Sequence, residues 1–259
     1  MVSVTDRVKH VKQPDGGYIN PDMFEVTCLD DDLVLNPNEN IDSSLIGMAV
    51  DYLTRYMSNK KEIKDAFKIS LKGASIVNQT DHAMTLLSKI TGLDDESIIN
   101  ACMLVGYDDC YRGGPQEYKS VEDIKPDQPT ISNIRTMVNR SLNFIKEYGP
   151  ITKYGFRFMG ASAKYIQSGD GDFLTQDTVW DFKVSKHEPT EKHTLQLLIY
   201  YLMGRESFES GISFLFINSL GIFNPRLNKV YILDVCDIPE EVIEKVSSEV
   251  IGLQQSNDW

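Results

Sequence analysis

Two acids and a lysine stand close together in the second half of the chain, around the polar pair Gln176-Asp177. Asp172 precedes this pair, and Asp181 and Lys183 follow it. The flanking residues are mostly β-branched or aromatic, which predicts two strands joined by a two-residue turn. Because side chains alternate between the faces of a strand, Asp181 and Lys183 share one face, and Asp172 can lie opposite them on the partner strand. The sequence therefore predicts that three charges converge.

This charged group has two interpretations, because the strand that carries Asp181 and Lys183 is otherwise apolar. An isolated charge buried among apolar residues is costly unless it is paired or holds an ion. In the structural interpretation, the two residues are the solvent-facing side of a half-buried strand. In the functional interpretation, Asp172 and Asp181 supply oxygen ligands for Mg²⁺, and Lys183 stabilises charge on a phosphate or orients a water molecule. That is the chemistry of a metal-dependent phosphodiesterase.

The segment after this hairpin, residues 190–204, predicts a helix that ends at a glycine. Its apolar residues recur at helical spacing: Leu195, Leu198, Ile199 and Leu202. Gln196 and Tyr200 are four residues apart, so they project from one side of the helix towards the hairpin. Such a pair is also typical of a helix surface, or of a core tyrosine with a satisfied hydroxyl. His193 lies in the first turn, where contact with a phosphate and ordinary surface placement are both open.

These three pieces follow one another in a fixed order: a G-x-x-D pattern from Gly169 to Asp172, a D-x-K pattern from Asp181 to Lys183, and a Q-x-x-x-Y pattern from Gln196 to Tyr200. Together they resemble the PD-(D/E)XK nuclease superfamily and, within it, the RecB-type branch. The resemblance implies an α/β fold with a restriction-endonuclease-like mixed central sheet flanked by helices. It also implies metal-dependent hydrolysis of phosphodiester bonds. The first acid follows a glycine and not the proline that names the superfamily, which is common in this branch.

The same branch carries a G-x-x-x-H pattern on an early helix, and this chain has Gly47 to Asp51 in its place. The resemblance therefore makes Asp51 a candidate third metal ligand. An aspartate at this position would favour hard ions such as Mg²⁺ or Mn²⁺. The alternative is that Asp51 lies on the exposed side of an amphipathic helix.

The resemblance implies a nuclease in which Asp172 and Asp181 bind Mg²⁺ or Mn²⁺ and Lys183 stabilises the charge that develops on the phosphorus. Gln196 and Tyr200 would orient the lysine or the nucleic-acid strand. DNA is favoured over RNA as the substrate. Since inactive relatives with the same fold exist, two alternatives stay open. One is a nuclease-fold protein that acts as an acidic protein-binding factor or inhibitor, as in a phage or mobile element. The other is a nuclease subunit that is active only in a complex.

The net charge of −12 opposes the binding of nucleic acid at long range. The negative charge is concentrated towards the ends. Residues 1–60 carry 5 basic and 10 acidic side chains and residues 210–259 carry 3 and 7, whereas residues 61–209 carry 18 and 21. A bound metal ion would offset part of the negative charge at the site. The acidic ends could engage a basic protein partner.

The pattern of elements predicts a mixed α/β sheet, because a helix separates apolar strands. The predicted domains are an extended arm over 1–40, a nuclease-like core formed by 41–58 and 150–259, and a helical insertion over 59–149. Within the core we expect a helix from residue 42 or 43 to about 57 and strands over 154–159, 164–166, 212–218 and 229–233. A last helix is expected after Pro239.

The four cysteines, Cys28, Cys102, Cys110 and Cys236, form no C-x-x-C pair. This spacing argues against a zinc site and against an iron–sulfur cluster, and favours reduced thiols. The sequence has no apolar run long enough to span a membrane, and its start does not resemble a secretory signal. We therefore expect a cytoplasmic protein without a membrane partner.

Overall fold

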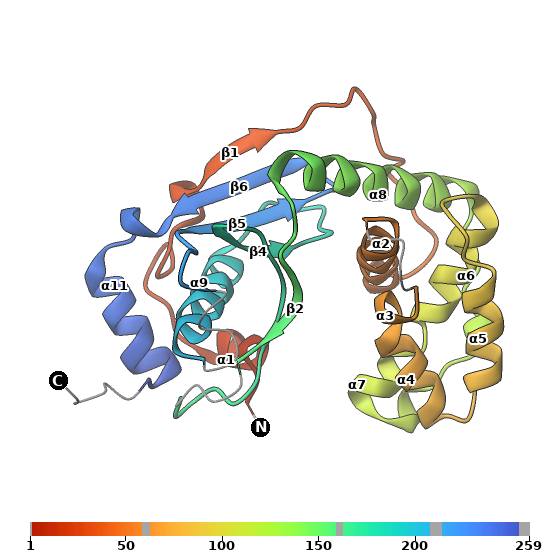
Figure 1. Ribbon diagram of the computed structural model, residues 1–259, viewed down its shortest axis with the longest axis horizontal. Coiled ribbons are helices and arrows are strands. Elements are labelled where there is room, and N and C mark those ends of the chain that lie inside the picture. The colour runs from red at the N-terminus through yellow and green to blue at the C-terminus, as the bar shows by residue number, and fades with distance from the viewer. Residues whose placement is uncertain (1, 59–62, 159–162, 208–213, 254–259) are drawn as a thin grey trace. The chain divides into compact units, whose positions relative to one another are not determined.

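The computed structural model describes residues 2–58, 63–158, 163–207 and 214–253, which are drawn in colour in Figure 1. The chain divides into two compact units. The first, called the sheet unit, comprises Met1–Leu29 and Tyr148–Trp259. The second, called the helical unit, comprises Asp30–Glu147.

The sheet unit is built on a six-stranded mixed sheet with the strand order β1-β6-β5-β4-β3-β2. Strands β4 and β5 are parallel, and every other neighbouring pair is antiparallel. The expected α/β architecture with a mixed sheet is therefore confirmed. The strands are β1 Glu25–Cys28, β2 Lys153–Arg157, β3 Asp170–Leu174, β4 Thr178–Phe182, β5 Ser219–Asn224 and β6 Lys229–Asp234.

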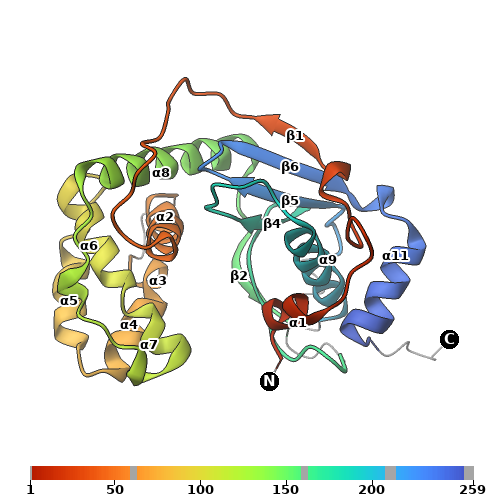
Figure 2. The same ribbon diagram turned by 180° about the vertical axis from the view of Figure 1, so that it is seen from behind.

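Helix α9, Glu191–Glu206, connects the parallel strands β4 and β5 and packs on the sheet. Two parallel strands need such a crossover, because the chain must return to the end of the sheet where the first strand began. A tight turn can join only antiparallel strands. The helix is apolar around most of its circumference, as expected of a helix covered on several sides. Helix α1, Val4–His10, and the π-helix η5, Val246–Ile251, also contact it. Figures 1 and 2 show α1 and α9 side by side on one face of the sheet.

Strands β3 and β4 form the predicted hairpin. Phe173 pairs with Trp180, and the Thr175 amide donates to the Thr178 carbonyl at 3.0 Å. This leaves Gln176 and Asp177 as the two-residue loop. On the face opposite α9, the Phe173 and Trp180 rings stack with centroids 6.2 Å apart. The indole also lies against Gly221 of β5, where a Cβ atom would come within 2.3 Å of the ring, so only glycine fits beneath it.

The first 29 residues differ from the predicted extended arm. They contain α1, the 3-10 helix η1 at Pro21–Met23, and strand β1, which pairs with β6. The side chains of Val4 and Val8 are buried in the core that α9 shares with the sheet, which holds the helix in place. Residues 30–40 and helix α2 cluster with the helical unit, whereas the sequence grouped 41–58 with the nuclease-like core.

Two strands are placed differently from the prediction. The expected strand at 212–218 begins outside the described residues, and from Phe214 to Asn218 the chain makes a turn before β5 starts at Ser219. Phe214 and Ile217 are buried, whereas Leu215 and Phe216 between them are exposed, so the apolar run packs two side chains into the core without forming a strand. Residues 164–166, also expected as a strand, form a bend. The expected strand at 154–159 is β2, and Met159 lies outside the described residues.

The last part of the sheet unit follows the prediction more closely. Strand β6 covers the expected strand at 229–233. Helix α11, Glu240–Lys245, begins directly after Pro239, and acids occupy its first turn as the helix dipole favours. A short 3-10 helix, η4, joins β6 to it over Val235–Asp237.

The helical unit contains no strand among its described residues. One buried polar group organises it: the Asp108 carboxylate accepts hydrogen bonds from the hydroxyls of Tyr52 at 2.6 Å and Ser70 at 2.5 Å. No described helix of the chain is long and apolar enough to cross a membrane. The helices are α2 Ser43–Ser58, α3 Ile63–Ala66, α4 Lys68–Ile76, α5 Thr80–Ser88, α6 Asp95–Val105, α7 Asp108–Gly113 and α8 Gln128–Tyr148, with the 3-10 helices η2 Pro115–Glu117 and η3 Val121–Asp123.

Candidate functional site

The hairpin places Asp172 and Asp181 on the face of the sheet that α9 covers. Leu174 on β3 and Val179 on β4 pair with each other and both belong to the core shared with α9. Because residues two apart share a face, Asp172 and Asp181 point to the same side. Oδ2 of Asp172 accepts a hydrogen bond from the Phe182 amide at 2.7 Å. One acid is thereby anchored to the strand that carries the other.

Lys183 follows β4 directly and is held by its backbone and by its side chain. Its amide donates to the Phe223 carbonyl of β5 at 3.0 Å. Its Nζ lies 3.0 Å from Oδ2 of Asp181. The Asp181 residue is only 1% exposed, whereas the lysine side chain is 24% exposed. The ion pair thus joins a buried carboxylate to a cation that solvent can reach.

The charge of Lys183 is maintained by the two acids. Burial disfavours the charged form of the lysine, but the carboxylates of Asp181 and Asp172 outweigh this, and the pKa of Lys183 lies above its ordinary value. The ammonium group therefore stays protonated at neutral pH. The two carboxylates and the ammonium together carry a charge of −1, so an anionic group would bind beside Lys183 only if a metal ion offset the acids.

One oxygen of this cluster lacks a hydrogen bond. Oδ2 of Asp181 is buried and is paired with the Lys183 ammonium, whose Nζ lies 3.0 Å away, but no group among the described residues completes a hydrogen bond to it. An ion pair recovers only part of the hydration that a buried carboxylate loses, so native proteins usually complete such a pair with further hydrogen bonds. A hard cation is one species that such a carboxylate oxygen would bind well.

Gln196 and Tyr200 extend the cluster along α9. Lys183 Nζ lies 3.5 Å from Oε1 of Gln196, and Nε2 of Gln196 donates to the Tyr200 hydroxyl at 2.7 Å. The lysine fixes the orientation of this amide, because the opposite one would direct its N–H groups at an ammonium. Burial, together with the charge of Asp181, raises the pKa of Tyr200, so its hydroxyl stays protonated. The structure thus brings together five of the six predicted site residues.

Asp51, the sixth predicted residue, belongs to helix α2 of the helical unit. Its two carboxylate oxygens accept hydrogen bonds from the Arg55 guanidinium at 2.8 and 2.7 Å. This is an i, i+4 ion pair along the helix, with side chains about a quarter exposed. The role of Asp51 as a metal ligand stays a prediction.

His193 acquires a defined place that its sequence position left open. Nδ1 of the imidazole accepts a hydrogen bond from the Thr190 amide at 3.1 Å, and the Thr190 side-chain oxygen accepts in return from the His193 backbone N–H. This is a capping box at the start of α9, with histidine where glutamate or glutamine is usual. Burial and the charge of Lys183 lower the pKa of His193 to about 4. The T-x-x-H spacing was the available signal in the sequence.

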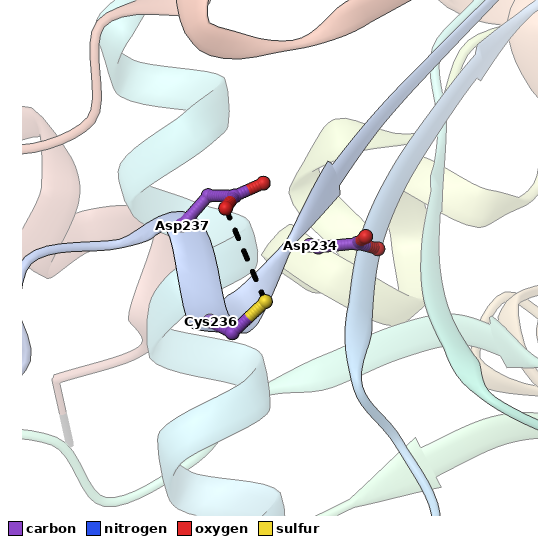
Figure 3. A group of neighbouring side chains, drawn as sticks. All are labelled: Asp234, Cys236 and Asp237. Atoms are coloured by element: carbon purple, nitrogen blue, oxygen red, sulfur yellow. Dashed lines mark hydrogen bonds between the residues drawn. The ribbon is translucent and has the colours of Figure 1, made fainter.

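A second group of possible ligand atoms lies after β6. Asp234, Cys236 and Asp237 are exposed, and their ligand atoms lie within 4.8 Å of one another (Figure 3). The thiol of Cys236 contacts Oδ1 of Asp237 at 4.0 Å, and Asp234 accepts a hydrogen bond from the Ser219 hydroxyl at 2.7 Å. Exposed acidic groups of this kind are common without an ion, so we assign no metal to them. Sequence reasoning did not identify this group, because the residues follow no ligand motif.

Comparisons with protein-family models, with curated proteins and with solved structures find no match to this chain. Its function therefore has to be inferred from the residues of the site. The five clustered residues combine two carboxylates, a cation held in the charged state, and a polar helix face that positions the cation. Such a set can bind a metal ion and a phosphate next to each other.

Proposed function

We propose that this protein is a metal-dependent nuclease that hydrolyses phosphodiester bonds of nucleic acid, with DNA as the favoured substrate. The observation that carries this proposal is the buried Oδ2 of Asp181, which lies beside the Lys183 ammonium but lacks a hydrogen bond from any residue that the structure describes. A purely structural ion pair in a core is normally completed by further hydrogen bonds, because the loss of hydration must be offset. An incomplete pair next to a second carboxylate favours a site that binds a further ion.

The donors present fit Mg²⁺ or Mn²⁺. Both ions prefer carboxylate oxygens, and the candidate ligands Asp172 and Asp181 lie on neighbouring strands of a rigid sheet. When bound, such an ion would polarise the phosphodiester and lower the pKa of an attacking water molecule. No soft ligand takes part in this cluster among the described residues, which disfavours a zinc thiolate site.

Lys183 is proposed to hold the negative charge that builds up on the phosphate. Its ammonium is partly exposed, so a phosphate can approach it, and the neighbouring acids keep it protonated. Gln196 accepts from this ammonium, and Tyr200 in turn accepts from the Gln196 amide. Gln196 and Tyr200 therefore position the lysine. Their predicted roles are supported by this chain of contacts.

The net charge of −12 favours one variation on this function, in which cleavage requires a protein partner. An acidic protein repels the phosphate backbone at distances up to a Debye length, about 8–10 Å at physiological salt. A basic partner would supply the attraction that the chain itself lacks. In the limiting case the chain binds such a partner and cuts nothing, as an acidic inhibitor would.

The test is a cleavage assay with single-stranded, double-stranded and circular DNA and with RNA, in Mg²⁺, in Mn²⁺ and in EDTA. We expect metal-dependent cleavage by the wild type and none by Lys183→Ala. Lys245→Ala is the matched control, because Lys245 is exposed on α11 of the same unit. This variant should cleave as the wild type does. Absence of cleavage by the wild type on every substrate would contradict the proposal and would favour a partner-binding role.

A further inference from the structure

Three side chains of α9 line up on the helix face that contacts Lys183. His193, Gln196 and Tyr200 are spaced i, i+3 and i+7, so they project from one side of the helix. Gln196 and Tyr200 form the hydrogen-bonded row already described. His193 continues this row by one turn towards the helix start, and the positive charge of Lys183 adds to the effect of burial in lowering its pKa.

The capping box determines which nitrogen of His193 carries the proton. Nδ1 accepts from the Thr190 amide, so a neutral imidazole must carry its hydrogen on Nε2. The two nitrogens lie at different corners of the ring, and Nε2 faces away from the cap. With a pKa lowered to about 4 by burial and by Lys183, the ring is neutral at pH 7. His193 therefore offers a hydrogen-bond donor that carries no charge.

Histidine is an unusual choice for the cap alone. The position usually holds glutamate or glutamine, whose oxygen accepts from the backbone amide. A glutamate here would place a third acid near Lys183 and would repel a phosphate. Histidine satisfies the same amide, adds no negative charge, and keeps a donor on its other nitrogen.

We propose that His193 is a binding residue for the nucleic-acid strand, and that its Nε2–H donates to a non-bridging phosphate oxygen beside the Lys183 ammonium. This inference rests on the proposed nuclease function and assigns to the same site one more contact with the phosphate backbone. Because the donor is neutral, it strengthens binding without changing the number of counterions released.

The test compares two substitutions that both preserve the cap. In His193→Gln the side-chain oxygen can accept from Thr190 and the amide N–H₂ remains as a donor, whereas His193→Glu keeps the acceptor and removes the donor. We expect both variants to melt at about the wild-type temperature. The dissociation constant of a fluorescent deoxyoligonucleotide, measured in Ca²⁺ by anisotropy, should stay within about threefold for His193→Gln. It should rise about 10- to 100-fold for His193→Glu, which loses the hydrogen bond and also repels the phosphate, so the nitrogen spectrum described below is needed to establish the hydrogen bond itself.

His187→Glu is the control for added charge, because His187 is exposed on the loop before α9. This variant should bind the oligonucleotide as the wild type does. A second readout is the ¹⁵N spectrum of the histidine rings, which should show His193 as the Nε2–H tautomer and a shift of its Nε2 signal when the oligonucleotide is added. If the wild type binds and cleaves but His193→Glu binds equally well, or the Nε2 signal stays in place at saturation, the inference is overturned and the nuclease function stands. If the wild type neither binds nor cleaves, both are overturned.

Discussion

Asp108 in the helical unit and Asp181 in the sheet unit are both almost fully buried, at 0% and 1% exposure, but their surroundings differ. Asp108 accepts from two hydroxyls, those of Tyr52 and Ser70, one on each oxygen, and the more distant Arg112 guanidinium lies 3.9 Å from its Oδ2. Asp181 faces the Lys183 ammonium, and within the described parts of the chain its Oδ2 has no hydrogen bond. The first arrangement is complete and joins three helices. The second is incomplete and is suited to receive another ligand.

The comparison separates two uses of a buried acid. Neutral hydroxyls stabilise a buried carboxylate by hydrogen bonds. At Asp108 burial outweighs these bonds, so the pKa of Asp108 is raised. A buried carboxylate beside a cation keeps its charge but costs desolvation energy that the pair alone seldom recovers. Active sites often retain groups that lower the stability of the fold locally, because favourable interactions elsewhere in the protein offset this loss of stability.

The largest expected effect comes from exchanging each acid for its amide. Asp181→Asn should reduce metal-dependent cleavage by about 10³-fold or more, because the amide cannot serve as an anionic ligand. We expect the melting temperature of this variant to fall, because the Lys183 ammonium loses its partner at 3.0 Å and keeps only the charge of Asp172 nearby. Asp108→Asn should retain cleavage. Gel assays with calorimetry check both, and a cleaving Asp181→Asn variant would break the distinction between the two acids.

A metal ion should stabilise the sheet unit through Asp172 and Asp181. Saturating Mn²⁺ is expected to raise the melting temperature of the wild type, with a gain of about 2.7 kcal/mol when the ion is at 100 times its dissociation constant. Asp172→Ala should remove this gain, whereas Asp108→Asn should preserve it. An equal gain in all three proteins would place the ion elsewhere, for example at the exposed acids after β6.

The raised pKa of Asp108 predicts an effect of pH on stability. The folded protein holds this proton where the unfolded chain has released it, so the free energy of unfolding falls as pH rises. The contribution is complete below the ordinary pKa of 3.8 and is lost as pH rises through the folded value. Asp108→Asn mimics the protonated acid. Between the ordinary pKa and the raised pKa of Asp108, the free energy of unfolding of this variant should rise relative to that of the wild type by up to about 1.4 kcal/mol per pH unit. Urea unfolding across pH 4–8 measures it, and parallel curves would contradict the assignment.

The smallest expected effect is that of Asp51→Asn on stability, and it helps to distinguish the two interpretations of Asp51. As a partner of Arg55 alone, it should contribute no more than about 0.5 kcal/mol, which Asp51→Asn would reveal in the melting temperature. As a metal ligand, the same substitution should also weaken Mn²⁺ binding at least about tenfold. Titration of Mn²⁺ followed by melting temperature separates these outcomes.

The sequence predicted most of the site because its signals are local. The two-residue turn at Gln176-Asp177 sets the hairpin, and the four-residue spacing of Gln196 and Tyr200 sets their common face. Both depend on a few neighbouring residues. The contact between Lys183 and Gln196 also requires that α9 packs on β4. The spacing of residues in the sequence suggests this packing but does not determine it.

Elements that depend on distant partners were predicted less well. The side chains of β1 are exposed on both faces and lack a buried alternation, so the strand is defined only by its pairing with β6. The apolar run before β5 resembled a strand, but Phe214 is buried beside Gly204 in a turn. Asp108 could not be recognised as buried, because its partners Tyr52 and Ser70 lie 56 and 38 residues away in the chain.

The packing of Trp180 gives the protein an intrinsic optical reporter. The chain has two tryptophans, and Trp180 is the one next to Asp181. Its indole is stacked on Phe173, lies over Gly221 and donates to the Thr175 hydroxyl at 3.0 Å. Its ring projects from the face opposite the Asp181 carboxylate, so an ion at the site would not touch it. In a Trp259→Phe background, a change in emission on adding a metal or an oligonucleotide would therefore report movement of the hairpin itself.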